Sequence, residues 1–500
     1  MMRSIGRTPR GDLIDGKWLL SGAESGEIVR SDPGDAREPP RRYPTFIHHV
    51  DLAVGFARRA VVGWNRRPEQ ERIRFLARLR DELSRRKHDL AVAISGDMGK
   101  PIWESNQEIE SMLAKIDLVV DDGLADLAMR RPVGVDGGYY YRPLGVVAVI
   151  GPFNFPARLP HGQAITALVA GNAVVMKASE LAPATGELYA EIMVAAGIPP
   201  GVFQLIQGGP DVGAALSSHP DLAAVMFTGS YQTGLRIQRA TLEQPGKLLV
   251  LEMGGKNATI VLADADIDQA AHDVASAAFI TTGQRCTATS RLVVDRKVAP
   301  KLLERVVALA QRVPIGYAFD DGVFMGPLVS EPLKKRFLSV VSQAERDPAV
   351  ESLLPTGSAE ASRPGSYVRP SIHRVLRRDP SSAYQRDELF GPDLAVYEVD
   401  GLEEAIAAAN DCDYGLAMSV YTRSEEAWAK VLDTASVGLL GWNRPTIGSS
   451  SRMPFAGLRR SGNHRDGGVH LMRSVVHPVA TIERRPLFQP ELLPPHFPRL

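Results

Sequence analysis

Cys286 and Glu252 are the two residues of this chain whose types and settings best suit covalent chemistry. Cys286 lies in the polar, glycine-flanked segment Gly283–Thr287, where a thiolate finds the partial exposure and the N–H or cationic neighbours that it needs. Glu252 ends an apolar run and precedes two glycines, which suits a base that activates water. Together they predict a covalent thiol intermediate that a hydrolytic step resolves. A small buried hydrophobe is the ordinary alternative for any single cysteine, including the other one, Cys412.

The segment Gly229–Gly234 is a candidate phosphate-binding turn. It follows an apolar run that ends at Phe227, and a glycine-flanked turn into a helix offers free N–H groups and the positive end of the helix dipole. A plain strand-to-helix connection has the same composition and is the commoner case. The Gly-x-Gly-x-x-Gly dinucleotide fingerprint follows no candidate strand of the chain.

The elements that must position these residues form an alternating pattern. Short apolar runs alternate with helical segments, first through Leu251 and then from Ala258 to about Val437, which predicts two mixed α/β domains with mainly parallel sheets. Ligands are then expected at the carboxyl ends of the strands. The runs of the first block are Val146–Ile150, Ala173–Met176, Val202–Ile206, Ala223–Phe227 and Leu248–Leu251.

Helices are predicted before the first block. Ile73, Leu76, Leu79 and Leu83 recur at helical spacing after Pro68. A further helix, after Lys100-Pro101, carries Ile109, Met112 and Ile116. The polar start of the chain, through Arg42, and the proline-rich tail beyond Arg485 are expected to be irregular.

The composition favours an enzyme of a reducing compartment. A chain of 500 residues suggests two or three domains. The 58 Lys and Arg balance the 58 Asp and Glu, so nothing favours nucleic acid or an anionic membrane as a partner. Two cysteines cannot form a disulfide framework. Because the start lacks the apolar stretch of a secretory signal and no run could span a bilayer, we expect a cytoplasmic protein with a small-molecule substrate.

Seven short motifs in a fixed order resemble those of the aldehyde dehydrogenase superfamily, and the resemblance runs from about Asp15 to about Glu483. It implies an α/β fold with a Rossmann-type cofactor domain, an α/β catalytic domain and a small β oligomerisation flap. The motifs are Pro152–Pro156, Lys177–Glu180, Phe227–Ser230, Glu252–Gly255, Gly283–Cys286, Glu388–Pro392 and Pro454–Gly457.

The resemblance also implies domain boundaries and an assembly. The NAD-binding domain would comprise residues 1–129 and 145–253, the catalytic domain 254–469, the flap 130–144 and 470–486, and the irregular tail 487–500. Tyr139–Tyr141 and Val475–Ile482 are expected to pair within the flap and to add to a partner subunit's sheet, which leaves no exposed edge. A homodimer or a dimer of dimers is expected.

For catalysis, the resemblance implies that Cys286 attacks the aldehyde carbon. Asn154 and the backbone N–H of Cys286 would stabilise the resulting alkoxide. After oxidation to a thioester, Glu252 would activate the water that releases the acid. From the residues alone, Asn154 is equally well a turn residue held between prolines.

The implied cofactor is NAD, with no metal ion. Lys177 and Glu180 would contact the adenosine ribose, and the Glu180 carboxylate would repel the 2′-phosphate of NADP; the alternative is a surface ion pair of little consequence. Glu388 would bind the nicotinamide ribose and Phe390 would pack near the ring, unless Glu388 belongs to a solvated loop. The pyrophosphate would dock on Gly229, Ser230, Tyr231, Gln232, Thr233 and Gly234.

The substrate is expected to be an acidic semialdehyde. Within the superfamily the chain most resembles the N-succinylglutamate 5-semialdehyde dehydrogenases of arginine breakdown, through Gly441–Pro445 and Ser461–Arg465. Arg158, His161 and Arg444 would border the substrate tunnel, since arginine binds carboxylates through a planar fork. Each of the three is equally well a surface or interface residue.

Three alternatives remain open at this point. The substrate could be another acidic semialdehyde, such as glutamate 5-semialdehyde or succinate semialdehyde. The chain could be a non-catalytic protein of the same fold, which the joint presence of Asn154, Glu252 and Cys286 opposes. An acylating enzyme that passes the thioester to coenzyme A would dispense with the hydrolytic glutamate, and Glu252 argues against it.

Overall fold

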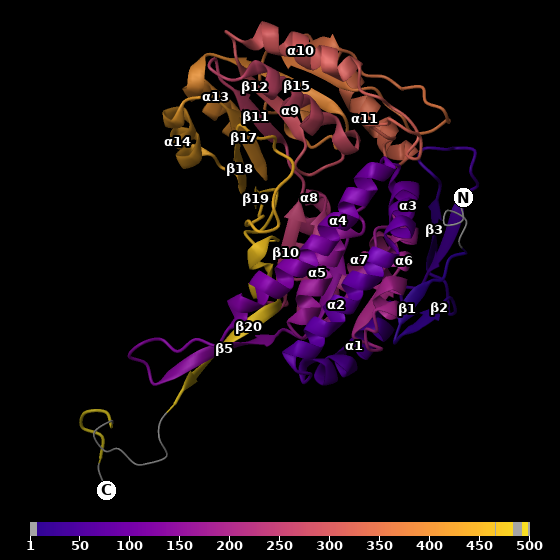
Figure 1. Ribbon diagram of the computed structural model, residues 1–500, viewed down its shortest axis with the longest axis vertical. Coiled ribbons are helices and arrows are strands. Elements are labelled where there is room, and N and C mark those ends of the chain that lie inside the picture. Colours follow the sequence, from indigo (N-terminus) through magenta and orange to yellow (C-terminus); the bar gives the residue numbers. More distant parts are fainter. Residues whose placement is uncertain (1–7, 466, 484–492, 499–500) are drawn as a thin grey trace.

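The computed structural model describes residues 8–465, 467–483 and 493–498. The chain forms two large lobes, each built on one sheet, and a two-stranded ribbon projects from the first lobe (Figure 1). No helix in these ranges is long and apolar enough to cross a membrane. Most of the predicted tail lies outside the described residues.

The first sheet has the strand order β10-β9-β6-β7-β8-β1-β2. The five adjacent strands from β10 to β8 are parallel, and β1 and β2 are antiparallel additions at the other edge. The chain winds outward from β6 in both directions, which makes the ends of β6 and β9 a topological switch point. The strands are β1 Asp12–Ile14, β2 Lys17–Leu19, β6 Val146–Ile150, β7 Ala173–Lys177, β8 Phe203–Ile206, β9 Ala224–Gly229 and β10 Leu248–Met253. The predicted runs of the first block are thus confirmed as parallel strands.

Helices cover both faces of this sheet because successive side chains of each strand alternate between two cores. Val147 and Val149 of β6 pack into the core under α2 to α6, whereas Val146 and Ala148 pack into the core under α1, α7 and α8. The helices are α1 His49–Asn65, α2 Glu69–Arg85, α3 Lys87–Met98, α4 Ile102–Leu118, α5 Arg158–Val169, α6 Pro183–Ala195, α7 Pro210–Ser218 and α8 Tyr231–Ala240. The predicted helices after Pro68 and Pro101 are confirmed as α2 and α4.

The second sheet has the order β13-β14-β15-β12-β11-β17-β18, and all of its strands except β13 run parallel. Its strands are β11 Asn257–Val261, β12 Thr289–Asp295, β13 Val350–Leu354, β14 Ser371–Val375, β15 Asp393–Val399, β17 Ala417–Tyr421 and β18 Leu439–Trp442. Its helices are α9 Ile267–Phe279, α10 Ala299–Gln311, α11 Glu331–Ala344, α12 Ala383–Arg386, α13 Gly401–Asn410 and α14 Glu425–Thr434.

The connection between the sheets sets how they face each other. β10 ends at Met253 and β11 begins at Asn257, so the chain passes from a carboxyl end of the first sheet almost directly to an amino end of the second. The parallel strands of the second sheet therefore present their amino ends toward the carboxyl ends of the first. Residues that follow strands in one lobe meet residues that precede strands in the other.

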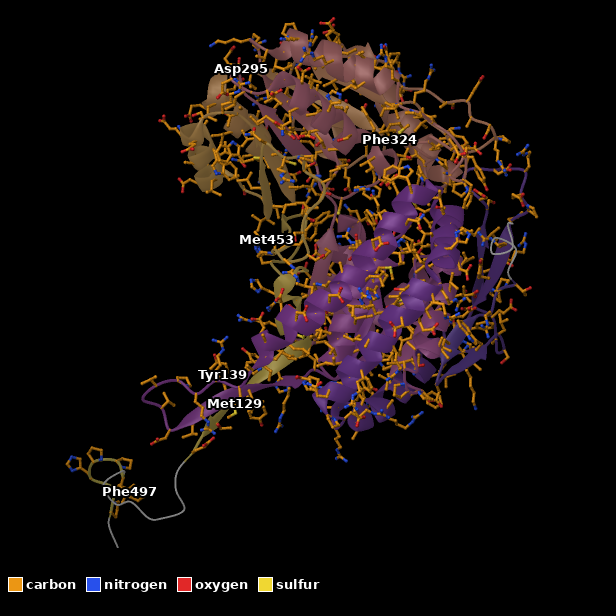
Figure 2. All side chains as sticks on the ribbon, in the orientation of Figure 1. Met129, Tyr139, Asp295, Phe324, Met453 and Phe497 are labelled. Atoms are coloured by element: carbon orange, nitrogen blue, oxygen red, sulfur yellow. The ribbon has the colours of Figure 1, made fainter. Side chains whose placement is uncertain are left out.

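The projecting ribbon consists of β5 Gly137–Pro143 and β20 Val476–Ile482, which pair antiparallel with Tyr141 opposite Pro478. This confirms the predicted pairing within the flap. Tyr139 lies in β5, and Met129 lies close to the ribbon (Figure 2). The remaining short elements are β3 Gly26–Arg30, β4 Arg41–Thr45, β16 Tyr414–Gly415, β19 Leu458–Arg459, η1 Val119–Gly123, η2 Leu124–Leu127, η3 Ile280–Gly283 and η4 Val469–Val475.

The prediction of an irregular start to the chain is wrong. β1 adds to β8 at the edge of the first sheet, and Leu13 and Ile14 are only 1% and 2% exposed. β3 and β4 form a second antiparallel pair. The apolar side chains of this polar segment are few, but they close the edge of the sheet and so fix its conformation.

Candidate active site

Cys286 lies in the loop between η3 and β12, at the amino edge of the second sheet, and is half-buried. Its backbone carbonyl accepts a hydrogen bond from Asn257 Nδ2 at 2.7 Å, while its N–H has no acceptor in the described part of the chain. Burial, with the charges of Glu388 and Glu252, raises the pKa of the thiol to about 12, against the opposing effect of Arg158 and Arg285. The resting group is therefore a thiol, and attack requires that its proton be removed.

Asn154 lies in the loop between β6 and α5, at the carboxyl edge of the first sheet, and is 3% exposed. Its side-chain oxygen accepts from the Phe155 N–H at 3.1 Å. This contact fixes the orientation of the amide, because the oxygen is engaged and Nδ2 remains available as a donor. Lys100 Nζ donates to the Asn154 backbone carbonyl at 3.1 Å and holds the same loop.

Glu252 lies in β10, next to the last residue of the strand, and is 7% exposed. It forms an antiparallel bridge with Gly462. Its carboxylate reaches Gly467, where an added Cβ would lie 2.5 Å from Oε1, so a side chain there would displace the carboxylate. Since its charge contributes to the raised pKa of Cys286, the structure brings the two groups into one electrostatic environment.

Glu388 and Phe390 lie in the loop before β15, also at the amino edge of the second sheet. Glu388 Oε1 accepts from the Gly255 N–H at 2.8 Å, and burial raises the pKa of this carboxyl to about 7. A side chain at Gly254 would overlap the Glu388 carboxylate. Phe390 has a φ of 55° and its ring packs edge-on against Phe153 at 5.6 Å, which joins this loop to the Asn154 loop.

The residues predicted to hold the adenosine end fit a dinucleotide. Lys177 ends β7 and lies 3.5 Å from the Glu180 carboxylate; Lys177 is buried and the Glu180 side chain is 44% exposed. Burial lowers the pKa of Lys177. A carboxylate that faces solvent beside an amine suits the hydroxyls of a ribose.

The segment Gly229–Gly234 forms the predicted turn into a helix. Ser230 is the N-cap of α8, and its Oγ accepts the Thr233 N–H at 3.3 Å. The first N–H groups of α8 have no partner within the helix, which suits a pyrophosphate.

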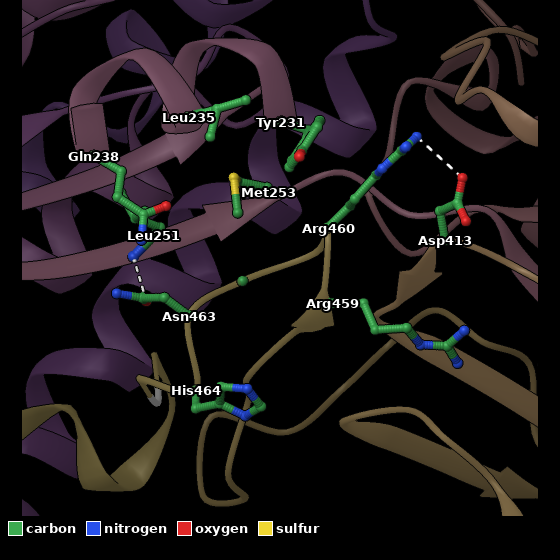
Figure 3. A pocket seen from close by; sticks show the side chains of 11 residues that line it. Tyr231, Leu235, Gln238, Leu251, Met253, Asp413, Arg459, Arg460, Asn463 and His464 are labelled. Atoms are coloured by element: carbon green, nitrogen blue, oxygen red, sulfur yellow. Dashed lines mark hydrogen bonds and ion pairs between the residues drawn. The ribbon is translucent and has the colours of Figure 1, made fainter. Parts of the chain in front are cut away.

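The Tyr231 side chain packs against Arg460. It lines a separate cavity of about 560 Å³ with Leu251 and Met253, across β10 from Glu252, because alternate residues of a strand face opposite sides (Figure 3). Arg460, which stacks on Tyr231 with its guanidinium carbon 5.2 Å from the ring centre, pairs with Asp413 at 3.1 Å in the same cavity.

Comparison with known proteins assigns this chain to a family. The model described as "Aldehyde dehydrogenase family" matches residues 45–479. The chain belongs to the aldehyde dehydrogenase family. It is an oxidoreductase that oxidises a small aldehyde with NAD(P) as the cofactor.

Similar proteins cover nearly all of this dehydrogenase. N-succinylglutamate 5-semialdehyde dehydrogenase of Novosphingobium aromaticivorans is 37% identical over 467 residues, which is 91% of this chain and 96% of the relative. N-succinylglutamate 5-semialdehyde dehydrogenase 2 of Caulobacter vibrioides is 37% identical over 483 residues, or 95% and 96%.

Solved structures agree with this assignment. A 1-pyrroline-5-carboxylate dehydrogenase from Thermus with bound NAD matches with a TM-score of 0.88 and 29% identity, covering 96% of this chain and 93% of that one. Aldehyde dehydrogenase C of Pseudomonas syringae, a mutant in complex with NAD+ and octanal, matches with a TM-score of 0.89 and 30% identity, covering 96% and 98%.

The three residues predicted to border the substrate have different surroundings in this dehydrogenase. Arg158 begins α5 beside the Asn154 loop, and its guanidinium has no hydrogen-bond acceptor among the described residues. Its guanidinium carbon lies 5.5 Å from the centre of the Phe155 ring. Arg444 is exposed, two residues before Thr446, whose hydroxyl donates to the Thr287 carbonyl next to Cys286 at 2.7 Å.

The hypothesis that His161 contacts the substrate does not fit the structure. His161 is fully buried, and its ring nitrogens lie 2.9 Å from the Tyr189 hydroxyl and 3.1 Å from the Met112 carbonyl. Burial lowers its pKa to about 3, so the ring is neutral. A neutral, fully hydrogen-bonded imidazole inside the helix layer cannot bind a carboxylate, so His161 is not a substrate-binding residue.

Several residues near the site were missed from the sequence. Arg285 precedes Cys286, and Asn257 donates a hydrogen bond to the Cys286 carbonyl. The buried residues Lys100, Glu104 and Glu108 surround the Asn154 and Cys286 loops. The four-residue spacing of the two glutamates on a predicted helix was visible, but exposed acids show the same spacing far more often.

Proposed function

We propose that the protein oxidises N-succinyl-L-glutamate 5-semialdehyde to N-succinyl-L-glutamate, with NAD preferred over NADP. The observation that carries the proposal is that the charges of Glu252 and of Arg158, which follows the Asn154 loop, both act on Cys286, in a chain whose relatives bear the name of this reaction. Each residue has the surroundings that its proposed role requires.

The oxidation begins at Cys286. The thiol proton passes to water, and Sγ attacks the aldehyde carbon. The carbonyl oxygen becomes an alkoxide that accepts from Asn154 Nδ2 and the Cys286 N–H, two donors whose direction is set before the substrate binds. Bound NAD(P) supplies the hydride acceptor that converts the thiohemiacetal into a thioester.

The release of the acid uses Glu252. Its carboxylate takes a proton from water, which attacks the thioester carbon and frees Cys286. The loss of Glu252 should therefore slow the release of the acid far more than the oxidation.

The substrate's carboxylates need cations, and Arg158 is the first candidate. Its guanidinium is half-buried beside Phe155, and burial lowers its pKa. A bound carboxylate would offset that penalty and accept a bidentate pair of hydrogen bonds. Arg444, exposed at the end of β18, would contact the more distant carboxylate.

The cofactor preference rests on Glu180. Its half-exposed carboxylate, 3.5 Å from Lys177 Nζ, would accept from both hydroxyls of an adenosine ribose and would meet a 2′-phosphate at close range. Glu388 and Phe390 would hold the nicotinamide end, and the turn at Ser230 the pyrophosphate.

We also propose the assembly, the domain division and the location that the sequence suggested. The chain would act in the cytoplasm as a homodimer or dimer of dimers, with the β5–β20 ribbon extending a partner's second sheet at β18. The boundaries would be those given for the discontinuous NAD-binding domain, the catalytic domain and the flap. Light scattering that reports a stable, active monomer at micromolar concentration would refute the assembly.

A substrate panel tests the proposed function. NADH formation is followed with N-succinylglutamate 5-semialdehyde, glutamate 5-semialdehyde, succinate semialdehyde and an uncharged aldehyde of similar length. The succinylated substrate should give the highest kcat/KM, and Arg158→Met should lower it by about 10-fold or more through KM while leaving the uncharged aldehyde unaffected. A higher kcat/KM for either unsuccinylated semialdehyde would contradict the substrate assignment.

A further inference from the structure

Helix α4 carries two buried carboxylates one turn apart, Glu104 and Glu108, each 2% exposed. Residues four apart lie on one face of a helix. Buried carboxylates are costly unless fully paired, so the partners of each define what it does. The two point to different sides of the proposed site.

Glu108 holds the loop of the first sheet. Its Oε1 accepts the N–H groups of Ala157 at 3.0 Å and Arg158 at 2.9 Å. These are free N–H groups at the start of α5, where the N-cap Ala157 has no side-chain acceptor. Its Oε2 pairs with Lys100 Nζ, which also donates to the Asn154 carbonyl at 3.1 Å. Glu108 therefore fixes the loop between β6 and α5 at two points, at Asn154 through Lys100 and at the start of α5 directly.

Glu104 holds the loop of the second sheet. It accepts from the N–H of Thr281 at 3.2 Å and from its hydroxyl, and it pairs with Arg285 Nη2 at 3.0 Å. Thr281 and Thr282 have φ values of 56° and 57°. Such a conformation is strained for β-branched residues and persists only where the surroundings enforce it. Glu104 supplies that constraint just before Cys286.

The ion pairs of Glu104 and Glu108 both contact Phe155. Lys100 Nζ lies 4.5 Å from the centre of its ring, and the guanidinium carbon of Arg285 lies 5.2 Å from it. Lys100 is the partner of Glu108 and Arg285 is the partner of Glu104. The cations of both ion pairs thus share one aromatic residue, which joins the two loops through packing as well as through α4.

We propose that Glu104 and Glu108 are positioning residues that set the separation of the two alkoxide donors, Asn154 Nδ2 and the Cys286 N–H. The inference rests on the proposed function. One rigid helix turn fixes the spacing between the carboxylates, and each carboxylate fixes one loop. Donors on two separate lobes are thereby held in register before the aldehyde arrives, and a displacement of about 1 Å would cost as much as about 100-fold in rate.

The first test compares glutamines at three positions of α4. Glu104→Gln and Glu108→Gln keep the side-chain shape but remove the charge that binds Arg285 or Lys100. Each should lower kcat by about 10- to 100-fold with the Kd for NAD nearly unchanged. The matched control is Glu110→Gln, on the same helix but exposed and paired with Lys87, which should keep wild-type kinetics. Wild-type kcat in both buried variants would overturn the inference.

A double-mutant cycle separates positioning from a merely structural role. Asn154→Ala should lower kcat by about 100- to 1000-fold. If Glu108 acts through Asn154, adding Glu108→Gln to that background should change kcat by less than about 2-fold, although the loss of Tm is the same in both backgrounds. Effects on kcat that multiply would show that Glu108 acts independently, and the inference would fall.

A double variant that replaces both members of the ion pair by apolar residues tests the inference in a protein that should still fold. Lys100→Met combined with Glu108→Leu removes both charges together, which is often tolerated in a buried pair. The folded double variant should show the same loss of kcat as Glu108→Gln, and wild-type kcat would overturn the inference. By contrast, full turnover in Asn154→Ala or Cys286→Ala would refute the proposed function itself.

Discussion

The two sheets contribute to the site from opposite ends of their strands. The first sheet supplies residues that follow or end strands: Asn154 after β6, Lys177 at the end of β7, and Glu252 near the end of β10. The second supplies residues that precede strands, Cys286 before β12 and Glu388 before β15. The rule that ligands bind at carboxyl ends in open α/β sheets describes the first lobe alone.

The difference teaches how a site between two sheets is built. The short link from β10 to β11 turns the amino edge of the second sheet toward the carboxyl edge of the first, so the candidate residues of the two lobes lie on facing edges. Neither edge holds a complete set of chemical groups. The relative placement of the edges therefore matters as much as the identity of the residues, and changes on each edge should have separable effects.

The largest expected effect is at the proposed nucleophile, Cys286, on the amino edge of the second sheet. Cys286→Ala should lower aldehyde oxidation by at least about 10⁴-fold while the Kd for NAD stays nearly unchanged, because only the group that forms the covalent intermediate is lost. The matched control is Cys412→Ala. That cysteine is 7% exposed and its Sγ lies 3.8 Å from the Lys256 carbonyl, so its loss should leave turnover intact. Substantial turnover in Cys286→Ala would end the covalent account.

A smaller effect is expected on the carboxyl edge of the first sheet, at the residues proposed to bind the adenosine ribose of NAD. NAD should be favoured over NADP by about 10- to 1000-fold in kcat/KM, because the Glu180 carboxylate would face the 2′-phosphate. Glu180→Gln should narrow that ratio mainly through a lower KM for NADP. Steady-state kinetics with both cofactors measure it, and equal use of the two by the unmodified enzyme would mean that Glu180 points away from the ribose.

The smallest expected effect is a pH dependence of NAD affinity, through Glu388 on the amino edge of the second sheet. Burial raises the pKa of Glu388 to about 7, so its protonated form dominates below that pH and the carboxylate above it. If the carboxylate accepts from the ribose, NAD affinity should rise by about 3- to 10-fold between pH ~6 and ~8. Glu388→Gln should lose this slope.

Glu187 provides the control for that titration. Burial raises its pKa to about 7 as well, but it accepts the N–H groups of Arg10 and Gly11 at the far edge of the sheet. Glu187→Gln should keep the slope of NAD affinity with pH. Calorimetric titrations at several pH values measure both variants, and a flat profile in the unmodified protein would contradict the role of Glu388.

Part of this picture could be predicted from sequence because the signals are local. The apolar runs of the first block predicted five strands, a glycine-flanked segment indicated the loop that carries Cys286, and a proline-flanked motif indicated the loop that carries Asn154. The position of β1 was missed, since Leu13 and Ile14 are too short a run to stand out in a polar segment. Pairing of distant strands depends on contacts that no local pattern encodes.

The side chains that hold the loops could not be predicted. Glu104 and Glu108 look like an exposed helical face until the fold buries them, and His161 looked available until α4 and α6 enclosed it. In each case burial decides the role, and burial is a property of the packed helices rather than of the neighbouring residues.

The acyl-enzyme of Glu252→Gln tests the central claim most directly, that Cys286 and Glu252 act in successive steps from facing edges. The variant is mixed with NAD and N-succinylglutamate 5-semialdehyde, and NADH formation and the mass of the peptide containing Cys286 are followed together. The account predicts a burst of NADH, slow turnover afterwards, and a succinylglutamyl adduct on Cys286. Loss of the burst and the steady state in equal measure, with Cys286 unmodified, would contradict it.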